Sequence, residues 1–158
     1  MTQKKSVRRV ENGAVSGCLD AGLLATSLGF ALRMASLSTT QRFSQVMSPF
    51  QLRPAQFATL VLIAANPGVR QRDICETLRI EKANFVGLLD TLQRRKLVER
   101  RADPRDRRRY AIYLTKEGQA LLRKAARAHD QMEAGLLTLL PARVRKDFVA
   151  NLKRLIPE

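Results

Sequence analysis

The sequence predicts a mainly α-helical protein that carries one small β-hairpin. Apolar residues recur at helical spacing through most of the 158 residues, and tryptophan is absent. Two short segments on either side of an arginine-rich stretch are typical of paired strands. A chain of this length forms one ordinary domain with a single core. Four prolines stand where helical stretches end or begin: Pro49, Pro54, Pro67 and Pro141.

The first predicted helix covers residues 19–47. Its apolar stripe consists of Leu24, Leu28, Ala31, Leu32, Ala35, Phe43 and Val46. Ser38 and Thr39 interrupt that stripe, which indicates either a helix with a polar dent or a groove where small polar side chains meet a ligand. The helix should end at Ser48, because the residue before a proline is biased out of the α region. Residues 1–18 are basic and show no periodicity, so we expect a flexible basic arm, either simply solvated or touching DNA or a partner subunit.

The second predicted helix begins at Pro54, since proline suits the first helical position. The residues expected on its buried face are Phe57, Leu60, Val61 and Ala64. The turn residues of the segment 66–68 (Asn-Pro-Gly) should terminate it.

Two further helices are predicted across a short turn, over residues 71–78 and from Lys82 to Gln93. In the second, a buried stripe is expected of Phe85, Leu88, Leu89 and Leu92. Left on the opposite face are Lys82, Ala83, Asn84 and Gly87. Two helices packed across a short turn form a helix-turn-helix, which presents its second helix to the major groove of DNA.

A small β-wing should follow, with strands at residues 97–100 and 110–114 joined by a loop from Arg101 to Arg109. The fold class is therefore a winged helix-turn-helix, with its core at residues 52–115. The whole chain has 29 basic and 14 acidic residues, a net charge of +15. Residues 94–109 contain nine basic and three acidic side chains. Because this charge lies in a wing and not on an amphipathic helix, it favours DNA over a membrane surface.

The C-terminal part should add two helices. Thr115 is expected to cap the first, whose apolar stripe consists of Leu122, Ala125, Ala126, His129, Met132, Leu136 and Leu140. Pro141 should begin the second, which carries Val144, Phe148, Leu152 and Leu155. Residues 116–158 have more apolar surface than a compact DNA-binding core needs. With residues 19–47 they are predicted to form a helical dimerisation layer, so that residues 19–158 make a single domain.

At these residues the chain resembles MarR-type (multiple-antibiotic-resistance regulator) repressors. The resemblance rests on the run from Leu78 to Gly118, above all on the triplet 106–108 (Asp-Arg-Arg) followed by Leu114-Thr115 and Gly118. It extends over roughly residues 24–155. It implies a homodimer that represses transcription from a pseudo-palindromic operator, with half-sites about one helical turn apart. Relatives with a similar reading helix imply release by a small molecule, an aromatic carboxylate or its coenzyme A thioester.

The DNA-reading residues expected on the second helix of the motif are Lys82, Ala83, Asn84 and Gly87. An asparagine amide can pair with adenine through two hydrogen bonds, and alanine can contact only a thymine methyl group. Many members of the family carry a long polar residue in place of Gly87. A helical glycine costs about 1 kcal/mol relative to alanine, so either close approach to DNA or close packing should explain it.

Further DNA contacts are expected from the arginines Arg72, Arg105, Arg107, Arg108 and Arg109. The resemblance implies that Asp106 orients Arg108, and a preorganised guanidinium suits a narrow minor groove. The alternative is an arginine-rich loop that is only solvated.

The effector site implied by the resemblance would lie on segments that carry Phe30, Phe43, Phe50 and Phe57. Phenylalanines at such positions are more often core than ligand contacts. His129 is an interface or core residue, or it donates a hydrogen bond to the effector. Cys75 should be a small core residue, and Cys18, which has no basic neighbour in sequence, is a weaker candidate for redox sensing.

Several functional classes are disfavoured. The sequence shows no catalytic motif and no spacing of metal ligands, so neither an enzyme nor a cofactor is expected. Two cysteines make no disulfide framework, and no run approaches the roughly 20 apolar residues of a membrane-spanning helix. The basic residues before the apolar patch 21–32 only superficially mimic a signal peptide. We therefore expect a cytoplasmic, nucleoid-associated protein of a bacterium or archaeon. The rival interpretation is a basic nucleoid- or RNA-associated protein that reads no sequence.

Overall fold

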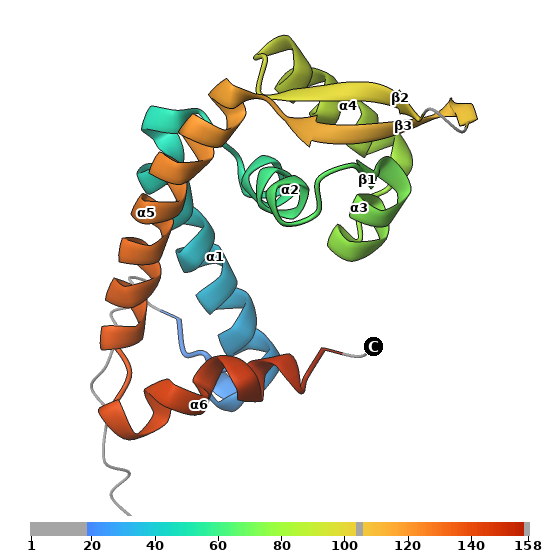
Figure 1. Cartoon of the computed structure of the whole chain (residues 1–158). Coiled ribbons are helices and arrows are strands. Elements are labelled where there is room, and N and C mark those ends of the chain that lie inside the picture. The colour runs from blue at the N-terminus through green and yellow to red at the C-terminus, as the bar shows by residue number, and fades with distance from the viewer. Residues whose placement is uncertain (1–18, 104–105, 157–158) are drawn as a thin grey trace, which may run out of the picture. The chain divides into compact units, whose positions relative to one another are not determined.

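Helices and one three-stranded antiparallel sheet make up the described part of the chain (Figure 1). The computed structural model describes residues 19–103 and 106–156, without side chains at residues 103 and 106–109. The chain divides into two compact units between Ala35 and Ser36. The boundary falls inside helix α1 (Leu28–Met47), and every later helix and strand belongs to the second unit.

The N-terminal helix is shorter than the sequence predicted. A 3₁₀ helix, η1 (Gly22–Thr26), comes first, and α1 starts only at Leu28. Gly22 has a φ of 50°, a left-handed conformation that a continuous α-helix cannot contain. The Ser27 hydroxyl accepts a hydrogen bond from the Phe30 amide at 3.3 Å and so caps the new start. The predicted end is confirmed, because α1 stops at Met47 and η2 (Ser48–Phe50) follows.

Helix α2 (Pro54–Ala65) has the predicted ends but a rotated buried face. Phe57 and Leu60 are buried as predicted, together with Thr59 and Ile63. Val61 is 40% exposed and Ala64 is exposed, so their predicted burial is wrong. The helix packs against α3, α4, α5 and strand β3, and these neighbours cover the side that carries Thr59 and Ile63. The Thr59 hydroxyl remains satisfied, since it donates to the Ala55 carbonyl at 2.7 Å.

The helix-turn-helix is confirmed as α3 (Gln71–Leu78) followed by α4 (Lys82–Arg94). Arg79 turns the chain in the left-handed region with a φ of 52°. The Ile80 amide then donates to the Cys75 carbonyl at 3.0 Å, which closes the turn. The predicted stripe of α4 faces inward: Phe85, Leu89 and Leu92 are fully buried and Leu88 is half-buried.

The wing is a longer hairpin than predicted. Strands β2 (Val98–Asp103) and β3 (Asp106–Leu114) pair over most of the stretch that the sequence assigned to a loop. Arg101, for example, pairs with Ala111, so the predicted 101–109 loop is wrong. The strand ladder uses backbone groups, and exposed arginines do not interrupt it. A further strand, β1 (Val69–Arg70), adds to the other edge of β3 and is too short to leave a sequence pattern.

The C-terminal part contains α5 (Lys116–Thr138) and α6 (Ala142–Lys153). Thr115 is confirmed as the cap of α5, because its hydroxyl accepts from the Gly118 amide at 2.9 Å and donates to the Lys96 carbonyl at 2.6 Å. Pro141 stands at the N-cap of α6, one residue before the helix.

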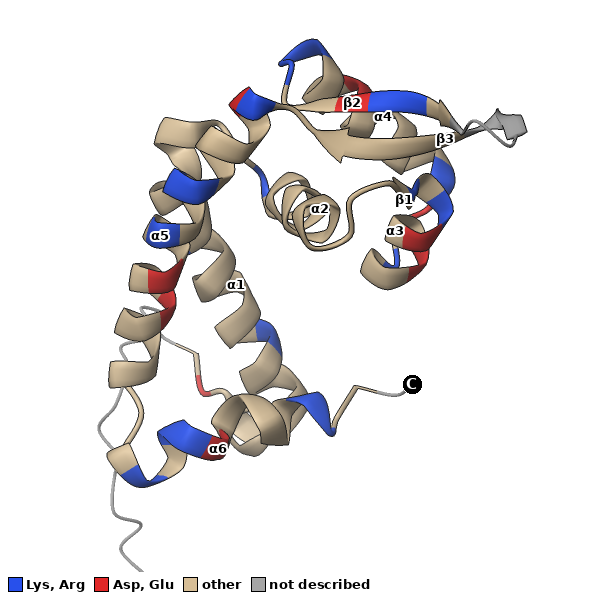
Figure 2. Cartoon of the chain, in the orientation of Figure 1, with Lys and Arg blue, Asp and Glu red and all other residues tan. Residues whose placement is uncertain are grey.

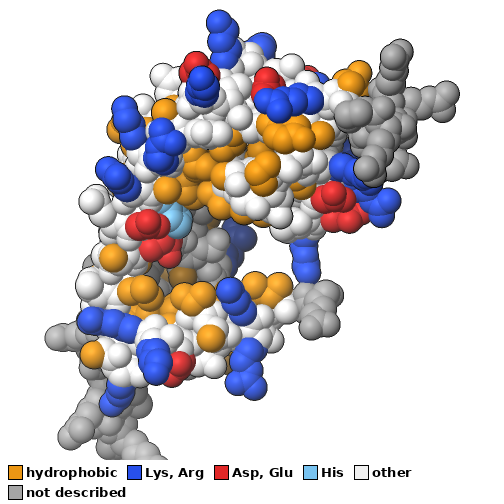
Figure 3. Space-filling view, in the orientation of Figure 1, with side chains coloured by type: hydrophobic (Ala, Val, Ile, Leu, Met, Phe, Trp, Pro, Cys, Tyr) orange, Lys and Arg blue, Asp and Glu red, His pale blue; other side chains and the backbone are white. Residues whose placement is uncertain are grey.

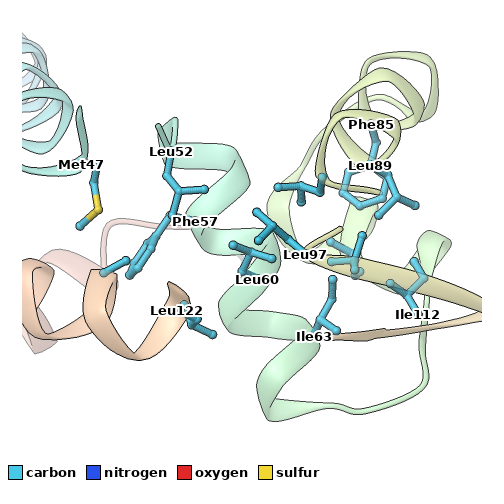
Figure 4. Close-up of a cluster of buried hydrophobic side chains, with 14 of the residues drawn as sticks. Met47, Leu52, Phe57, Leu60, Ile63, Phe85, Leu89, Leu97, Ile112 and Leu122 are labelled. Carbon is cyan, nitrogen blue, oxygen red and sulfur yellow. The ribbon is translucent and has the colours of Figure 1, made fainter. Parts of the chain in front are cut away.

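The core of the second unit has two connected parts (Figure 4). In one part, Leu60 and Ile63 of α2 lie beside Phe85 and Leu89 of α4 and Ile112 of β3. The other part lies where the end of α1, the start of α2 and the first turns of α5 meet, and it contains Met47, Leu52, Phe57 and Leu122. Helix α4 is thus held on one face by a packed core, and its other face is exposed.

Candidate functional site

The open face of α4 carries the residues that the sequence assigned to DNA. Lys82, Ala83, Asn84 and Gly87 are all exposed, in the first turns of the helix. Val86, 43% exposed, shares this face. The sequence did not predict Val86 on this face, because a valine close to Phe85 and Leu89 is typical of a core residue. The helix therefore offers a lysine, an amide and several small apolar groups to whatever it contacts.

Within the described chain, no neighbouring atom requires a glycine at position 87. A Cβ atom built on it would have no heavy atom within 4 Å. Of the two explanations that the sequence left open, close packing inside the protein is therefore excluded for the described residues. The helix surface is simply low at this point, so another molecule could approach the backbone closely.

Basic residues continue from the end of α4 into the wing (Figure 2). Arg94 and Lys96 are exposed around the turn after α4, and Arg101 is exposed on β2. Arg101 stacks over the Tyr113 ring at 4.4 Å and pairs with Glu99. Arg94 and Lys96 thus extend the exposed basic surface beyond the end of α4, where it can attract a polyanion.

Two arginines fix the position of α4 relative to its neighbours. The Arg100 side chain of β2 donates to the Asp90 carboxylate at 2.7 Å, which ties the wing to the middle of α4. Arg95, at the end of α4, donates to the backbone carbonyls of Gln51 at 2.6 Å and Phe50 at 2.8 Å. These bonds connect the end of α4 to the turn between α1 and α2. Helix α4 is therefore held by side-chain hydrogen bonds near its middle and at its end.

Arg72 and Cys75 lie on α3, close to the start of α4. The Arg72 guanidinium bonds the Glu76 carboxylate at 2.6 Å, and that bond raises the pKa of Arg72. Arg72 is exposed, so it could reach DNA only by giving up or sharing this pair. Cys75 is buried and its pKa is raised, chiefly by desolvation, with Lys82 opposing the shift. The prediction that Cys75 is a core residue is confirmed; a raised pKa keeps its thiol protonated and unreactive.

The remaining predicted residues of the wing fall outside the described side chains. Arg105 lies outside the described residues altogether. Asp106, Arg107, Arg108 and Arg109 belong to the backbone of β3, and their side chains are not described. Their assignment to DNA, and the pairing of Asp106 with Arg108, stay predictions. Cys18 also lies outside the described residues.

A second candidate site lies between α1, α2 and α5. Phe57 stacks on the His129 ring with centroids 4.9 Å apart, and Phe43 meets both rings edge-on. The imidazole nitrogens of His129 lie 3.8 Å from the carboxylates of Asp130 and Glu133, longer than a hydrogen bond. The structure thus brings three predicted effector residues together. Phe50, at the turn after α1, packs partly buried against the core.

A small pocket opens beside this aromatic cluster. Its volume is about 190 Å³, and its walls come from Thr39, Thr40, Phe43, Pro54, His129, Met132 and Glu133. Thr39 was one of the two residues that suggested a polar groove, and its hydroxyl donates to the Ser36 carbonyl at 3.0 Å. Phe30 belongs to the other compact unit, so the structure does not place it at this pocket.

Helix α6 leaves apolar side chains uncovered (Figure 3). None of its residues is buried, and Val144, Phe148 and Val149 are at least one-third exposed. The helix nevertheless carries apolar residues at helical spacing, which is typical of a surface that another chain covers.

Within the described ranges, no three residues of the types that bind metals lie close enough to hold an ion. Among the same residues, no helix is long and apolar enough to cross a membrane.

Comparisons with known proteins agree with this architecture. A family model described as the MarR family matches residues 50–109. The transcriptional regulator HosA of Escherichia coli O111:H- is 30% identical over 105 residues, which cover 66% of this chain and 78% of HosA. The structure of the transcriptional repressor CouR bound to a 23-mer DNA duplex superposes with a TM-score of 0.82 at 38% identity, covering 87% of this chain and 97% of CouR. The structure of CouR bound to p-coumaroyl-CoA gives 0.79 at 36% identity, covering 87% and 96%.

Proposed function

We propose that this chain, which belongs to the MarR family of transcription regulators, reads its operator with the open face of α4. Membership of this family makes the chain a DNA-binding regulator and not an enzyme, as the sequence predicted. The observation that carries the proposal is the exposure of Lys82, Ala83, Asn84 and Gly87 on a helix whose opposite face is fully buried. Such a helix can enter a major groove without disturbing its own core.

Within this proposal the residues have separate roles. Lys82 contacts a phosphate and Asn84 pairs with an adenine, since phosphate contacts supply affinity and base contacts supply specificity. The hairpin β2–β3 reaches the adjacent minor groove with Arg105, Arg107, Arg108 and Arg109. Asp106 holds Arg108, and Arg72 adds a phosphate contact by sharing its charge with Glu76.

The regulator acts as a homodimer. MarR-family regulators are dimeric, and residues 116–158 supply the uncovered apolar face of α6 that a partner subunit would bury. Residues 19–47 complete the dimerisation layer within a single domain 19–158. The basic arm predicted for residues 1–18 lies outside the described residues. A twofold dimer requires a pseudo-palindromic operator with half-sites about one helical turn apart. The regulator acts on the chromosome, in the cytoplasm of a bacterium or archaeon.

The effector is an aromatic carboxylate or, by preference, its coenzyme A thioester. One of the similar structures is CouR bound to p-coumaroyl-CoA. The pocket beside Phe43, Phe57 and His129 has aromatic walls and one imidazole, a combination that fits a phenolic ring. At about 190 Å³ it is smaller than typical sites for drug-sized ligands. It would therefore take the aromatic acyl group and leave coenzyme A outside. The assignment of Phe30 to the effector site stays a prediction from the sequence.

Release of DNA follows from linkage. An effector can weaken DNA binding only by as much as it prefers the conformation that binds DNA poorly. The candidate pocket touches the end of α1 and the start of α2, and Arg95 ties the turn between these helices to α4. A shift of α1 relative to α2 would therefore be transmitted to the reading helix.

Fluorescence anisotropy tests the proposal. The labelled duplex carries the intergenic DNA beside the protein's own gene, and its shuffled version serves as control, both across a range of salt. A specific regulator favours its site by about 10³-fold or more. Adding p-coumaroyl-CoA should release the specific duplex, whereas coenzyme A alone should not, and His129→Ala should weaken release without changing DNA affinity. Equal affinities for specific and shuffled duplexes, each falling steeply with salt, would instead support the rival basic protein that reads no sequence.

A further inference from the structure

Three residues on the open face of α4 form an apolar strip. Ala83, Val86 and Gly87 lie three and four residues apart along the helix, so they share one face. We call these residues the reading strip. All of them are exposed, and Val86 keeps 43% of its surface open. Lys82 and Asn84 border the strip.

Among the described residues, neither Val86 nor Gly87 belongs to the hydrophobic core. Valine and glycine form helices less readily than alanine, and here neither is compensated by core packing. Gly87 has open space where a side chain would stand. The Val86 side chain borders an open hollow of about 450 Å³ that is also lined by Arg100 and Tyr110. An exposed branched side chain beside a bare backbone leaves a low apolar surface that another molecule can contact closely.

The chemistry of the major groove supplies a matching partner. Base edges there present hydrogen-bond donors and acceptors, and the one apolar group is the 5-methyl group of thymine. We propose that Val86 is a specificity-determining residue that, together with Ala83, contacts a thymine methyl group. Gly87 keeps the helix surface low enough for that contact. The inference rests on the proposed function, since it requires α4 to lie in the major groove.

The polar neighbours of the strip narrow the sequence that it reads. Asp90, one turn further along α4, is bonded to Arg100 at 2.7 Å and is thereby directed toward the wing. A carboxylate held this way is not offered to the amino group of a cytosine. Asn84 is suited to adenine. The proposal therefore expects an A·T pair under Asn84 and a thymine under Val86.

The experiment begins with selection of the preferred duplex from a random library. Each thymine of that duplex is then replaced in turn by deoxyuridine, which removes only the 5-methyl group. At one position per half-site the wild-type protein should bind roughly fourfold more weakly, as expected for the loss of one buried methyl-sized group. Val86→Ala should lose most of this preference for thymine over deoxyuridine, because only Ala83 would remain to contact the methyl group. Val86→Thr, which keeps the branched shape and one methyl group, should retain part of the preference.

Val61→Ala is the matched control, because Val61 is also an exposed helical valine, at 40% exposure, but lies on α2. It should keep the full thymine preference. Alanine is the better helix former, so Val86→Ala should unfold no more easily than the wild type. Equal losses for wild type and Val86→Ala at every position would overturn the role of Val86 and leave the proposed function standing. A library without any preferred sequence would overturn both.

Discussion

Two glycines in helices of this chain should respond to alanine in opposite ways. Gly118, in the first turn of α5, packs against the backbone that leads into β2. A Cβ atom on Gly118 would come 2.9 Å from the Leu97 carbonyl carbon and closer still to its oxygen, and these backbone atoms cannot rotate away. The same Leu97 oxygen accepts the Thr115 amide at 3.1 Å, so any shift disturbs the start of the helix. At Gly87 the added methyl group would meet no atom within 4 Å.

The magnitude for Gly118→Ala follows from three contributions. Overpacking costs about 1–3 kcal/mol, and weakening the Thr115 cap costs about 0.5–2 kcal/mol. The better helix propensity of alanine returns up to about 1 kcal/mol. We therefore expect a free energy of unfolding lower by about 2–3 kcal/mol. For Gly87→Ala only the propensity gain remains, so the free energy of unfolding should rise by about 0.5–1 kcal/mol.

Urea denaturation of the three proteins at one protein concentration measures both changes, since the stability of a dimer depends on concentration. The midpoint for Gly118→Ala should fall and that for Gly87→Ala should rise, with unchanged slopes. If both variants were stabilised alike, α5 would not approach Leu97 this closely in solution.

Further predictions concern DNA binding, the linkage through Arg95 and the buried thiol. Gly87→Ala should weaken operator binding about tenfold or more despite its stabler fold, because a methyl group would keep α4 away from the groove; unchanged affinity would exclude close approach. Arg95→Ala should lower the free energy of unfolding by about 2 kcal/mol, because two charged hydrogen bonds are lost. Arg95→Lys should recover at most half of that loss. Chemical denaturation of the three proteins measures both changes. In a Cys18→Ser background, Cys75 should resist alkylation in the native protein and react once urea unfolds it; rapid native labelling would contradict its burial. Because burial raises its pKa, the folded state keeps the thiol proton longer than the unfolded state does. Stability should therefore fall as pH rises above about 8.5, with a slope that Cys75→Ala removes.

The sequence alone predicted the parts of this protein that depend on local patterns. Helical spacing placed α3 and α4, and prolines placed the ends of α1 and α2, because these signals act over a few residues. The cap at Thr115 was equally visible. The exposed side of α4 followed from its own buried stripe, so the spacing of apolar residues was sufficient to name Lys82, Ala83, Asn84 and Gly87.

Only the tertiary structure decided the features that depend on distant parts of the chain. The buried face of α2 is set by its neighbours, so Thr59 and Ile63 are covered where Val61 had been expected. The extra length of the hairpin comes from backbone pairing between β2 and β3. A run of arginines in the sequence does not indicate such pairing. Two contacts join residues that are mostly more than forty positions apart. One is the ring cluster of Phe43, Phe57 and His129, and the other is the pair of hydrogen bonds from Arg95 to the turn after α1. Local composition determines which helix can face DNA, and three-dimensional packing determines what holds that helix in place, because packing partners are chosen in space and not along the chain.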